Sequence, residues 1–196
     1  MSSAERDAPH LFERHVAGEQ VFQGKFLDVR YDTVELPDGL RATREYIVHP
    51  GAVMIVPLLD DGRLVMERQY RYPVQRVLLE FPAGKVDPGE DWFATARREL
   101  LEETGYRAAE WARAGLMHNA CAYSTEGIEV WFARGLTRGE RALDEGELID
   151  VCLVSPDELD AAIARGEATD AKTMVGLLWL QRWRAGAWVL DWQPAP

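Results

Sequence analysis

The chain has little cysteine, no long apolar run and a shortage of positive charge, and each of these excludes a class of protein. Cys121 and Cys152 are its only cysteines; they lack the spacing of zinc ligands, and without a secretory signal we expect them to be reduced. No apolar run approaches the roughly 20 residues of a membrane-spanning helix. The N-terminal segment MSSAERDAPHLFERH lacks the apolar stretch of a signal peptide, so we expect a cytoplasmic protein.

The shortage of positive charge limits the partners. Acidic residues outnumber basic ones by 33 to 22, and the formal net charge is −11. A nucleic-acid-binding protein usually presents a basic face, so we expect neither nucleic acid nor an anionic membrane as a partner. A small anionic ligand is still compatible with this composition, because a bound cation can make one site locally positive.

The pattern of apolar and turn-forming residues predicts an α+β protein with strands in its N-terminal half. Residues 21–48 alternate in polarity around the turn Pro37-Asp38-Gly39, which predicts an antiparallel hairpin or meander. Residues 52–59 and 63–70 flank Asp60-Asp61-Gly62, which predicts a second hairpin. Further strands are expected at 77–84, 111–118, 128–135 and 147–154.

Three helices complete the prediction. The first runs from Asp91 to Thr104 and stops at Gly105. Ser155-Pro156-Asp157-Glu158 is a capping box that opens the second, and residues 170–185 form the third. We expect two domains, an N-terminal β extension of residues 1–50 and a main domain of residues 51–196.

The first of these helices carries its acidic residues at an unfavourable place. Glu99, Glu102 and Glu103 lie near its C-terminal end, where the helix dipole disfavours negative charge. At 100° per residue the three fall within about 100° of one another, so their carboxylates repel. Their spacing alone leaves two readings open, a solvated acidic face or a site for a divalent cation with oxygen ligands.

The surrounding residues favour the cation site. From Gly84 to Tyr106 the chain fits the pattern G-x5-E-x7-R-E-(apolar)-x-E-E-x-G-(apolar) at every fixed position. This is the Nudix box, and the chain resembles the Nudix hydrolase family. The resemblance implies an α/β/α sandwich around a mixed sheet, and hydrolysis of a nucleoside diphosphate linked to another group.

The resemblance also implies a Mg²⁺ site, with Mn²⁺ as a possible substitute. Glu99 and Glu103 would be the main ligands, Glu102 a ligand or a base, and the carbonyl of Ala83 a further ligand. Cations held there would lower the pKa of water and neutralise phosphate oxygens, which explains how an acidic protein could bind an acidic substrate.

A second stretch points to a branch of the family. Residues 68–71 read Arg-Gln-Tyr-Arg, and Glu80 opens the sequence EFPAGK, so this region resembles the ADP-ribose pyrophosphatases and their nucleotide-sugar relatives. Arg68 and Arg71 would bind one phosphate together if the strand bends between them, since guanidinium groups bind phosphate bidentately. Glu80 would either contact the substrate or lie beside the metal site.

The same branch implies two further features. Its N-terminal strands reach across a homodimer, which would place Arg44 near the substrate, although an ordinary edge hairpin is an alternative. In the loop after the box, Glu126 would act as base or metal ligand, with Glu129 as the second candidate. Many ADP-ribose enzymes have a proline in this loop, whereas this chain has none between Pro88 and Pro156.

These observations leave three functions to compare. The leading one is Mg²⁺-dependent hydrolysis of ADP-ribose, or a similar nucleoside diphosphate sugar, to AMP and ribose 5-phosphate. The missing loop proline keeps GDP-mannose or another nucleotide sugar as an alternative substrate. A Nudix-fold sensor that binds a metabolite without cleaving it is the third, and the intact box argues against it.

Overall fold

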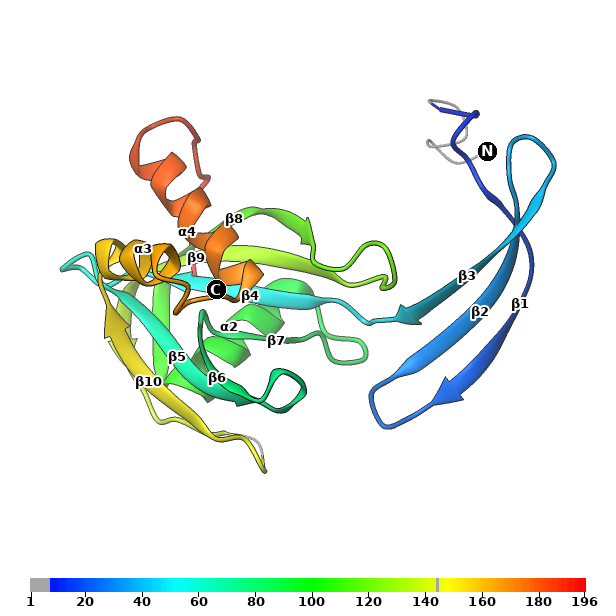
Figure 1. The fold of residues 1–196 in the computed structure, drawn as a ribbon. Helices are drawn as coiled ribbons and strands as arrows, with labels where there is room; N and C mark the ends of the chain where they lie inside the picture. Colours follow the sequence, from blue (N-terminus) through cyan, green and yellow to red (C-terminus); the bar gives the residue numbers. More distant parts are fainter. Residues whose placement is uncertain (1–7, 144) are drawn as a thin grey trace. The chain divides into compact units, whose positions relative to one another are not determined.

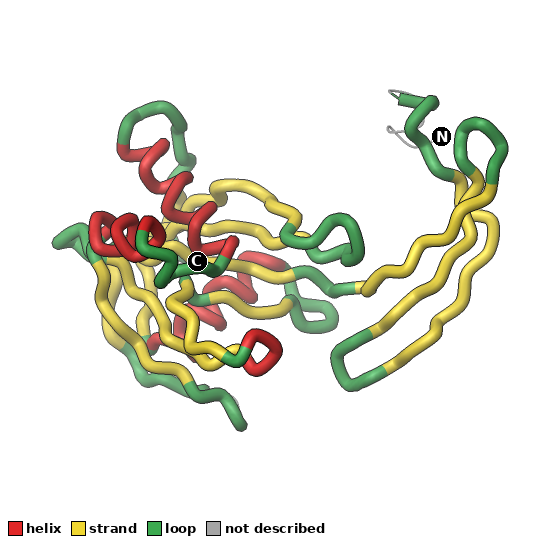
Figure 2. The backbone as a smooth tube through the Cα atoms, in the orientation of Figure 1, coloured by secondary structure: helices red, strands yellow, loops and turns green. Residues whose placement is uncertain are grey.

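The computed structural model describes residues 8–143 and 145–196 and divides into two compact units (Figures 1 and 2). The first unit contains the chain up to Pro50 together with Ala120–Glu126. The second contains Gly51–Asn119 and Gly127–Pro196. The first unit is therefore built from two segments that lie far apart in the sequence.

The first unit is a three-stranded antiparallel sheet in the order β1-β2-β3. Val34 is the only buried apolar residue among its described residues, so this thin sheet has almost no core of its own. The loop Ala120–Glu126 pairs with the end of the sheet through a bridge between Ile47 and Ser124. The strands are β1 (Arg14–Gln23), β2 (Asp28–Glu35) and β3 (Arg41–Val48).

The second unit contains two sheets, one of five strands and one of three. The larger is mixed, because its central strands β4 and β9 are parallel while the other neighbours are antiparallel. Its order is β11 (Gln193–Pro194), β8 (Tyr106–His118), β9 (Gly127–Arg138), β4 (Ala52–Pro57) and β7 (Ala83–Lys85). The smaller has the order β10 (Ile149–Val154), β5 (Leu64–Arg71) and β6 (Arg76–Glu80), with the short helix η1 (Tyr72–Val74) after β5.

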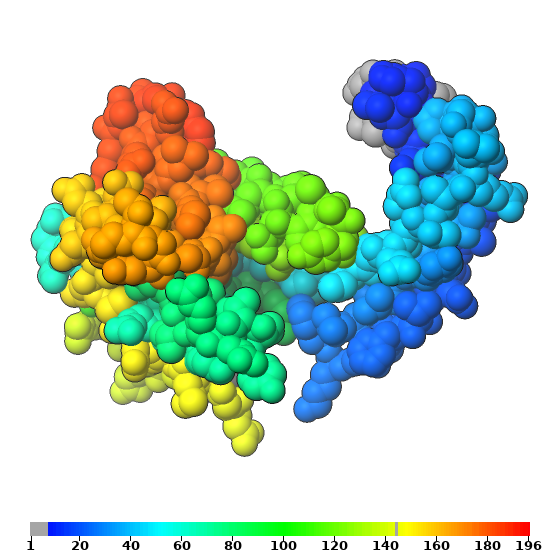
Figure 3. Space-filling view, viewed as in Figure 1, coloured from blue at the N-terminus to red at the C-terminus, as the bar shows by residue number. Residues whose placement is uncertain are grey.

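Helices cover both faces of the larger sheet, and β4 shows why. All six of its residues are buried, and the first five, Ala52 to Val56, alternate between two hydrophobic clusters. Met54 packs in the cluster that contains residues of α3 (Pro156–Ala164) and α4 (Ala171–Arg184), whereas Val53 packs in the cluster that contains residues of α2 (Trp92–Thr104). The result is the α/β/α sandwich with a mixed sheet; Figure 3 shows α3 and α4 side by side in orange.

Two local predictions were wrong, and both errors occur where the chain passes from one sheet to the other. Asp60-Asp61-Gly62 does form a turn, but β4 and β5 belong to different sheets and meet only at the bridge between Leu58 and Leu64. The expected strand 77–84 is also broken, because Pro82 has no N–H for a ladder and separates β6 from β7. The sequence of a strand that is buried on both faces is a continuous apolar run. Such a run does not indicate which strands pair with it.

The three helices lie where the sequence predicts them. Ser155 caps α3 in a full capping box with Glu158, and Asp170 caps α4 by accepting from the N–H of Thr173. Across residues 8–143 and 145–196, none of the helices combines the length and apolar character needed to cross a bilayer.

Candidate metal centre and active site

Helix α2 positions the acidic residues of the Nudix box. It begins after Asp91, whose carboxylate accepts hydrogen bonds from the N–H groups of Phe93 and Ala94 at 3.0 Å each. It ends at Gly105, which has φ +74° and donates its N–H to the carbonyl of Leu101 at 2.8 Å. Such a left-handed conformation favours glycine, so the glycine of the box fixes where the helix stops.

The three glutamates at this end of α2 are not equally exposed. The side chain of Glu99 is 13% exposed and that of Glu102 is 31% exposed, whereas Glu103 is buried. Glu103 accepts a hydrogen bond from the N–H of Ala83 at 2.9 Å, which joins the helix to the loop before Gly84. The solvated acidic face considered from spacing alone therefore does not describe Glu99 and Glu103.

Arg98 neutralises part of this negative charge. Its Nη1 donates to Glu99 at 2.8 Å and to Glu102 at 3.0 Å, and its Nη2 donates to Glu90 at 2.9 Å. These bonds hold the loop before α2 against the helix and raise the pKa of the guanidinium, with Glu90 as the main cause. Arg98 and Glu90 therefore act as a structural brace between the loop and the helix.

Burial changes the acidity of the two less exposed glutamates. It raises the pKa of Glu99 to about 7, although Arg98 acts in the opposite direction. Burial also raises the pKa of Glu103, and the neighbouring carboxylates of Glu67 and Glu99 raise it further. Without a cation, this site thus favours protonated over ionised carboxyl groups.

Gly84 is required because Glu99 lies directly against it. A Cβ atom built at Gly84 would lie only 1.9 Å from Oε1 of Glu99 and 2.0 Å from its Cδ. No side chain fits in that space, so the loop and the carboxylate approach each other only when this position is glycine. The first glycine of the box therefore permits a close contact rather than a special φ angle.

Glu67 is a buried carboxylate that the sequence analysis missed. It lies on β5, is 3% exposed, and its Oε1 has no hydrogen-bond partner among the described residues. It lies directly opposite Glu80 in the ladder between β5 and β6, and its charge raises the pKa of Glu103. An acid directly after the buried run Leu64–Met66 was the available signal.

Near this centre, buried Glu80 forms an ion pair with the partly exposed Arg71. The guanidinium of Arg71 binds both carboxylate oxygens of Glu80, at 2.7 and 2.8 Å. Lys172 at the start of α4 also contacts Glu80, and its Nζ lies 3.0 Å from the carboxylate of Asp170. Glu80 therefore holds two cationic side chains in place, a connection that sequence spacing did not reveal.

Arg68 is not brought together with Arg71. Strand β5 continues unbroken from Leu64 to Arg71, so residues three apart project from opposite faces of the sheet. Arg71 shares its face with Glu80, while exposed Arg68 lies on the face of Met66. The bend that would let both arginines reach one phosphate is absent from this strand.

The remaining site candidates divide between the units. Arg44 lies on β3 in the first unit, where its guanidinium pairs with Glu13. Glu126 also belongs to the first unit, and its carboxylate lies 3.4 Å from Nε2 of His49. Glu129 lies on β9 in the second unit and forms an ion pair with Arg113, so its carboxylate is already engaged.

The donor set suits a hard divalent cation. Carboxylate oxygens and a backbone carbonyl are the ligands that Mg²⁺, Mn²⁺ and Ca²⁺ prefer. Among the described residues, no three acidic, histidine or cysteine side chains already converge on one point. The fit rests instead on excess negative charge, because Glu67 is buried with an oxygen that has no partner and Glu103 is buried beside it.

Together, the sandwich and the acidic helix end define the class of protein. The family model of the NUDIX domain matches residues 48–177, which is most of the chain. The chain therefore belongs to the Nudix family. The model of the nucleoside diphosphate sugar hydrolase N-terminal domain matches residues 14–47, which cover β1, β2 and nearly all of β3.

Several individual relatives are similar over most of their length. An ADP-ribose pyrophosphatase of Bacillus subtilis is 37% identical over 87% of this chain and 94% of its own. A methanol dehydrogenase activator of Bacillus methanolicus is 36% identical over 86% of this chain and 92% of its own. A crystal structure of an ADP compounds hydrolase has a TM-score of 0.81 and 25% identity, covering 90% of this chain and 97% of that one.

Proposed function

We propose that this Nudix enzyme hydrolyses ADP-ribose, or a similar nucleoside diphosphate sugar, to AMP and ribose 5-phosphate with Mg²⁺ as its cation. The similarity to an ADP-ribose pyrophosphatase over nearly the whole chain supports the substrate class. The observation that carries the chemistry is the set of Glu67, Glu99 and Glu103, whose burial raises their pKa values. In this reaction one water molecule is consumed and one P–O bond of the pyrophosphate is broken.

The glutamates of α2 would hold the cation together with the carbonyl of Ala83. Glu99 and Glu103 are the proposed main ligands, and Glu102 is a ligand or a base. When bound, the divalent cation would neutralise pyrophosphate oxygens and lower the pKa of the attacking water. Arg98 contributes by holding Glu99 and Glu102 with hydrogen bonds, which limits the side-chain entropy lost when a cation binds.

Arg71 is the proposed phosphate-binding residue in the second unit. Its guanidinium is fixed by two hydrogen bonds to buried Glu80, and its side chain is 41% exposed. A guanidinium held in this way loses little freedom when it binds a phosphate oxygen. Glu80 would thus orient Arg71, while Arg68 and Arg44 are proposed to contact other parts of the substrate.

Glu126 is the proposed general base. Its loop is anchored to β3 by hydrogen bonds from Ile47 to Tyr123 at 2.9 Å and from Thr125 to Ile47 at 3.0 Å. His49 lies beside the carboxylate, with its Nε2 3.4 Å from the nearer oxygen. A general base needs a side chain that can accept a proton from water, and a carboxylate on an anchored loop fits this role.

A homodimer through the first unit is part of the proposal. The described part of that unit contains one buried apolar residue, and several large apolar side chains on or beside its strands are exposed. Isolated sheets of this kind are marginal unless an apolar face packs against a partner. We expect light scattering in solution to give about twice the 22.2 kDa chain mass. The exposed apolar side chains of the first unit include Val21, Phe22, Phe26, Leu27 and Tyr31.

A substrate panel tests the function. Purified protein with MgCl₂ or MnCl₂ would be given ADP-ribose, GDP-mannose, UDP-glucose and diadenosine diphosphate. Phosphate released by added alkaline phosphatase would be measured, and mass spectrometry would identify AMP and ribose 5-phosphate. We expect ADP-ribose to give the highest kcat/KM; a GDP-sugar ranking well above it would overturn the substrate assignment.

A second arm distinguishes catalysis from sensing. Calorimetry with ADP-ribose in EDTA would measure binding without turnover, and MgCl₂ would then be added. Tight binding with no product at any concentration of MgCl₂ or MnCl₂ would identify a metabolite sensor and contradict the proposed hydrolysis.

A further inference from the structure

The start of α4 is held against the end of β6 by contacts of two consecutive residues. The side chain of Lys172 is 12% exposed and binds the carboxylate of Glu80, which is 3% exposed. The next residue, Thr173, accepts a hydrogen bond from the N–H of Phe81 at 3.1 Å. A Cβ atom built at Gly176 would lie only 2.9 Å from the ring of Phe81, so α4 packs directly on this strand end. These contacts fix where Lys172 lies relative to Glu80.

Lys172 lies between two carboxylates. Its Nζ lies 3.0 Å from the carboxylate of Asp170, which also caps α4 by accepting from the N–H of Thr173 at 2.9 Å. On its other side it shares Oε2 of Glu80 with Nη2 of Arg71. Two acids and two bases therefore form one closed group without net charge. Charged groups with little exposure are tolerated in such an arrangement because each has a partner of opposite sign.

Glu80 needs a second cationic partner because another buried acid lies opposite it. Glu67 is 3% exposed and is the direct neighbour of Glu80 in the ladder between β5 and β6. Burial raises the pKa of Glu80, but Arg71 and Lys172 together outweigh burial, so the pKa lies below its ordinary value. Glu80 is therefore ionised and can accept from Nε and Nη2 of Arg71 at the same time.

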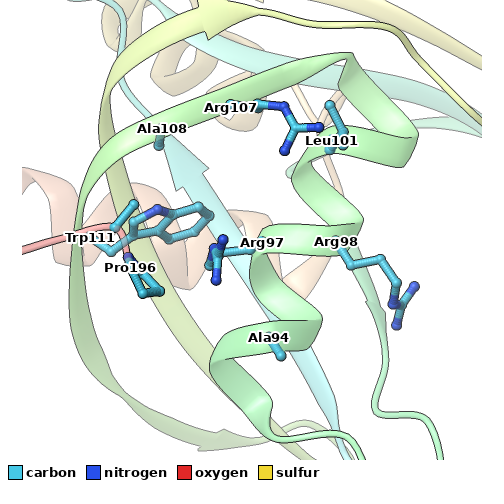
Figure 4. Close-up of a pocket in the computed structure, with 9 residues that line it drawn as sticks. Ala94, Arg97, Arg98, Leu101, Arg107, Ala108, Trp111 and Pro196 are labelled. Carbon is cyan, nitrogen blue, oxygen red and sulfur yellow. The ribbon is translucent and has the colours of Figure 1, made fainter.

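Two arginines of the second unit are held by glutamates, and they differ in what is left free. Arg98 uses both terminal nitrogens on glutamates, and Figure 4 shows its side chain extending away from Trp111 and the cavity that its stem borders. Arg71 is 41% exposed and uses only Nε and Nη2, both on Glu80. None of the described residues accepts a hydrogen bond from its Nη1. Arg71 is thus held at two nitrogens and keeps one donor for a ligand.

We propose that Lys172 is a positioning residue for the binding of a substrate phosphate: it fixes the carboxylate of Glu80, and Glu80 in turn fixes the guanidinium of Arg71. The inference rests on the proposed hydrolysis of a nucleoside diphosphate sugar, in which Arg71 binds a phosphate. The free Nη1 of Arg71 would donate to a phosphate oxygen. Lys172 does not need to touch the substrate, because its Nζ is already engaged by two carboxylates.

The position of Arg71 connects this group with the proposed cation site. The hydrogen bond to Glu80 is the main cause of the raised pKa of Arg71, and the negative charge of Glu103 contributes to it. The guanidinium therefore lies within electrostatic range of a proposed cation ligand. A phosphate bound by Arg71 would be close to the cation, so the placement of this arginine decides how well the pyrophosphate is aligned.

A double-mutant cycle tests whether Lys172 acts through Arg71. Steady-state kinetics with ADP-ribose and MgCl₂ would compare the wild type, K172M, R71Q and R71Q/K172M. We expect K172M to raise KM roughly tenfold or more and to change kcat by less than about threefold, because a weaker phosphate contact affects the bound substrate and the transition state alike. The KM of R71Q/K172M should lie within about twofold of that of R71Q, because no guanidinium is left to position. If the effects of the two changes multiply instead, Lys172 acts independently of Arg71 and the proposal is overturned.

Nuclear magnetic resonance separates this inference from the proposed function. The full chain would carry isotope-labelled arginine and be kept in EDTA without substrate, and the Nε–H signal lost in R71Q would be assigned to Arg71. We expect this signal to be resolved in the wild type and to broaden and shift toward that of free arginine in K172M. K172R keeps a cation between the same carboxylates and should restore the signal. R182Q removes an exposed arginine near the other end of α4 and should leave it unchanged.

The possible results are decisive for Lys172 even without turnover. An absent Arg71 signal in the wild type, an unchanged signal in K172M, or an equal loss in R182Q would overturn the inference. So would a K172M protein that is less stable to urea but has the KM of the wild type. If K172M does not fold, K172Q takes its place, because its amide still donates to a carboxylate but carries no charge; the same changes are expected. If the wild type cleaves no nucleotide sugar, the proposed function fails, while the signal still shows whether Lys172 holds Arg71.

Discussion

The charged side chains on the two sides of helix α2 lie in opposite environments, buried on one side and exposed on the other. On one side, Glu99 and Glu103 are carboxylates in surroundings that favour the protonated form. On the other, Arg97 and Arg107 are exposed and always charged, and they need no counter-ion to remain in water. Burying an ionised carboxylate without a partner costs several kcal/mol, whereas an exposed guanidinium costs little.

This difference is the reason for placing the proposed cation on the glutamate side of α2. Buried acids are destabilising unless something compensates them, so their presence supports the proposal that a cation binds the folded protein. The exposed arginines need no such compensation. We therefore expect variants on the glutamate side to have the larger effects on activity and stability.

The largest expected effect follows from removing two carboxylate charges. E99Q/E103Q should lower kcat by roughly 10³-fold or more, because the cation that we propose they hold would supply several kcal/mol of transition-state stabilisation. Product release and Mn²⁺ affinity by electron paramagnetic resonance would be measured together. E110Q, an exposed acid on β8 paired with Arg134, is the control and should keep its activity. Wild-type turnover in the double variant would remove the assigned cation role.

A smaller loss is expected when the glutamates are kept but one is displaced. In G84A the added Cβ would overlap Oε1 of Glu99, which must then move. A displacement of about 1 Å in a catalytic group can cost roughly 10²-fold in rate, so we expect a loss of that order in kcat/KM. Overpacking should also lower the free energy of unfolding by about 1–3 kcal/mol. Unchanged kinetics in a folded G84A protein would contradict the close contact.

Glu67 should affect stability with a sign that depends on pH. Burial raises the pKa of Glu67 to about 8. At pH values between the ordinary pKa of a carboxyl group and this value, the folded protein therefore binds more protons than the unfolded chain. Wild-type stability contributed by this group is therefore lost as pH rises. In EDTA, E67Q should be more stable than the wild type by about 1–3 kcal/mol at pH 8 and by less at pH 5.

Urea unfolding at both pH values would measure this difference, with E110Q as the matched control. Adding MgCl₂ should stabilise the wild type more than E67Q, because a cation compensates the buried carboxylate only where it is present. If E67Q is less stable than the wild type in EDTA at both pH values, Glu67 has a cationic partner in the folded protein. That result would refute the idea that its negative charge is uncompensated.

The smallest effect is expected at the beginning of α2. D91A removes a cap that accepts two N–H groups, and it should lower the free energy of unfolding by about 1 kcal/mol with little change in kcat. D157A removes an exposed acid from the first turn of α3 without removing its cap, so it serves as the control. A large fall in kcat for D91A would mean that the helix start also positions the glutamates.

Much of the fold could be predicted because it depends on local chemistry. The caps of α2 and α3 and the stop at Gly105 are encoded by neighbouring residues, so the helices lie where the sequence places them. Strand partners could not be predicted in the same way. The sheet change at Pro82 and the parallel pairing of β4 with β9 depend on residues distant in the sequence.

The candidate site shows the same limit. Glu99, Glu102 and Glu103 form a local pattern on one helix and were identified as a group. The contacts of Glu80 with Lys172, and of Glu126 with His49, join residues 92 and 77 positions apart, so no local pattern contains them. Glu67 was missed because only its burial against α2 distinguishes it from an ordinary polar strand end.

The loop of Ala120–Glu126 has a consequence for anyone who shortens this chain. Its main chain bonds to Ile47, so cutting after Pro50 would remove the strand that orders a segment from the middle of the sequence. Ile47 and Ser124 are 77 positions apart, so folding must likewise close a long loop before this segment finds its strand, an entropic cost that favours collapse of the sandwich first. The N-terminal sheet thus behaves as a template for the loop and cannot be treated as a removable appendage.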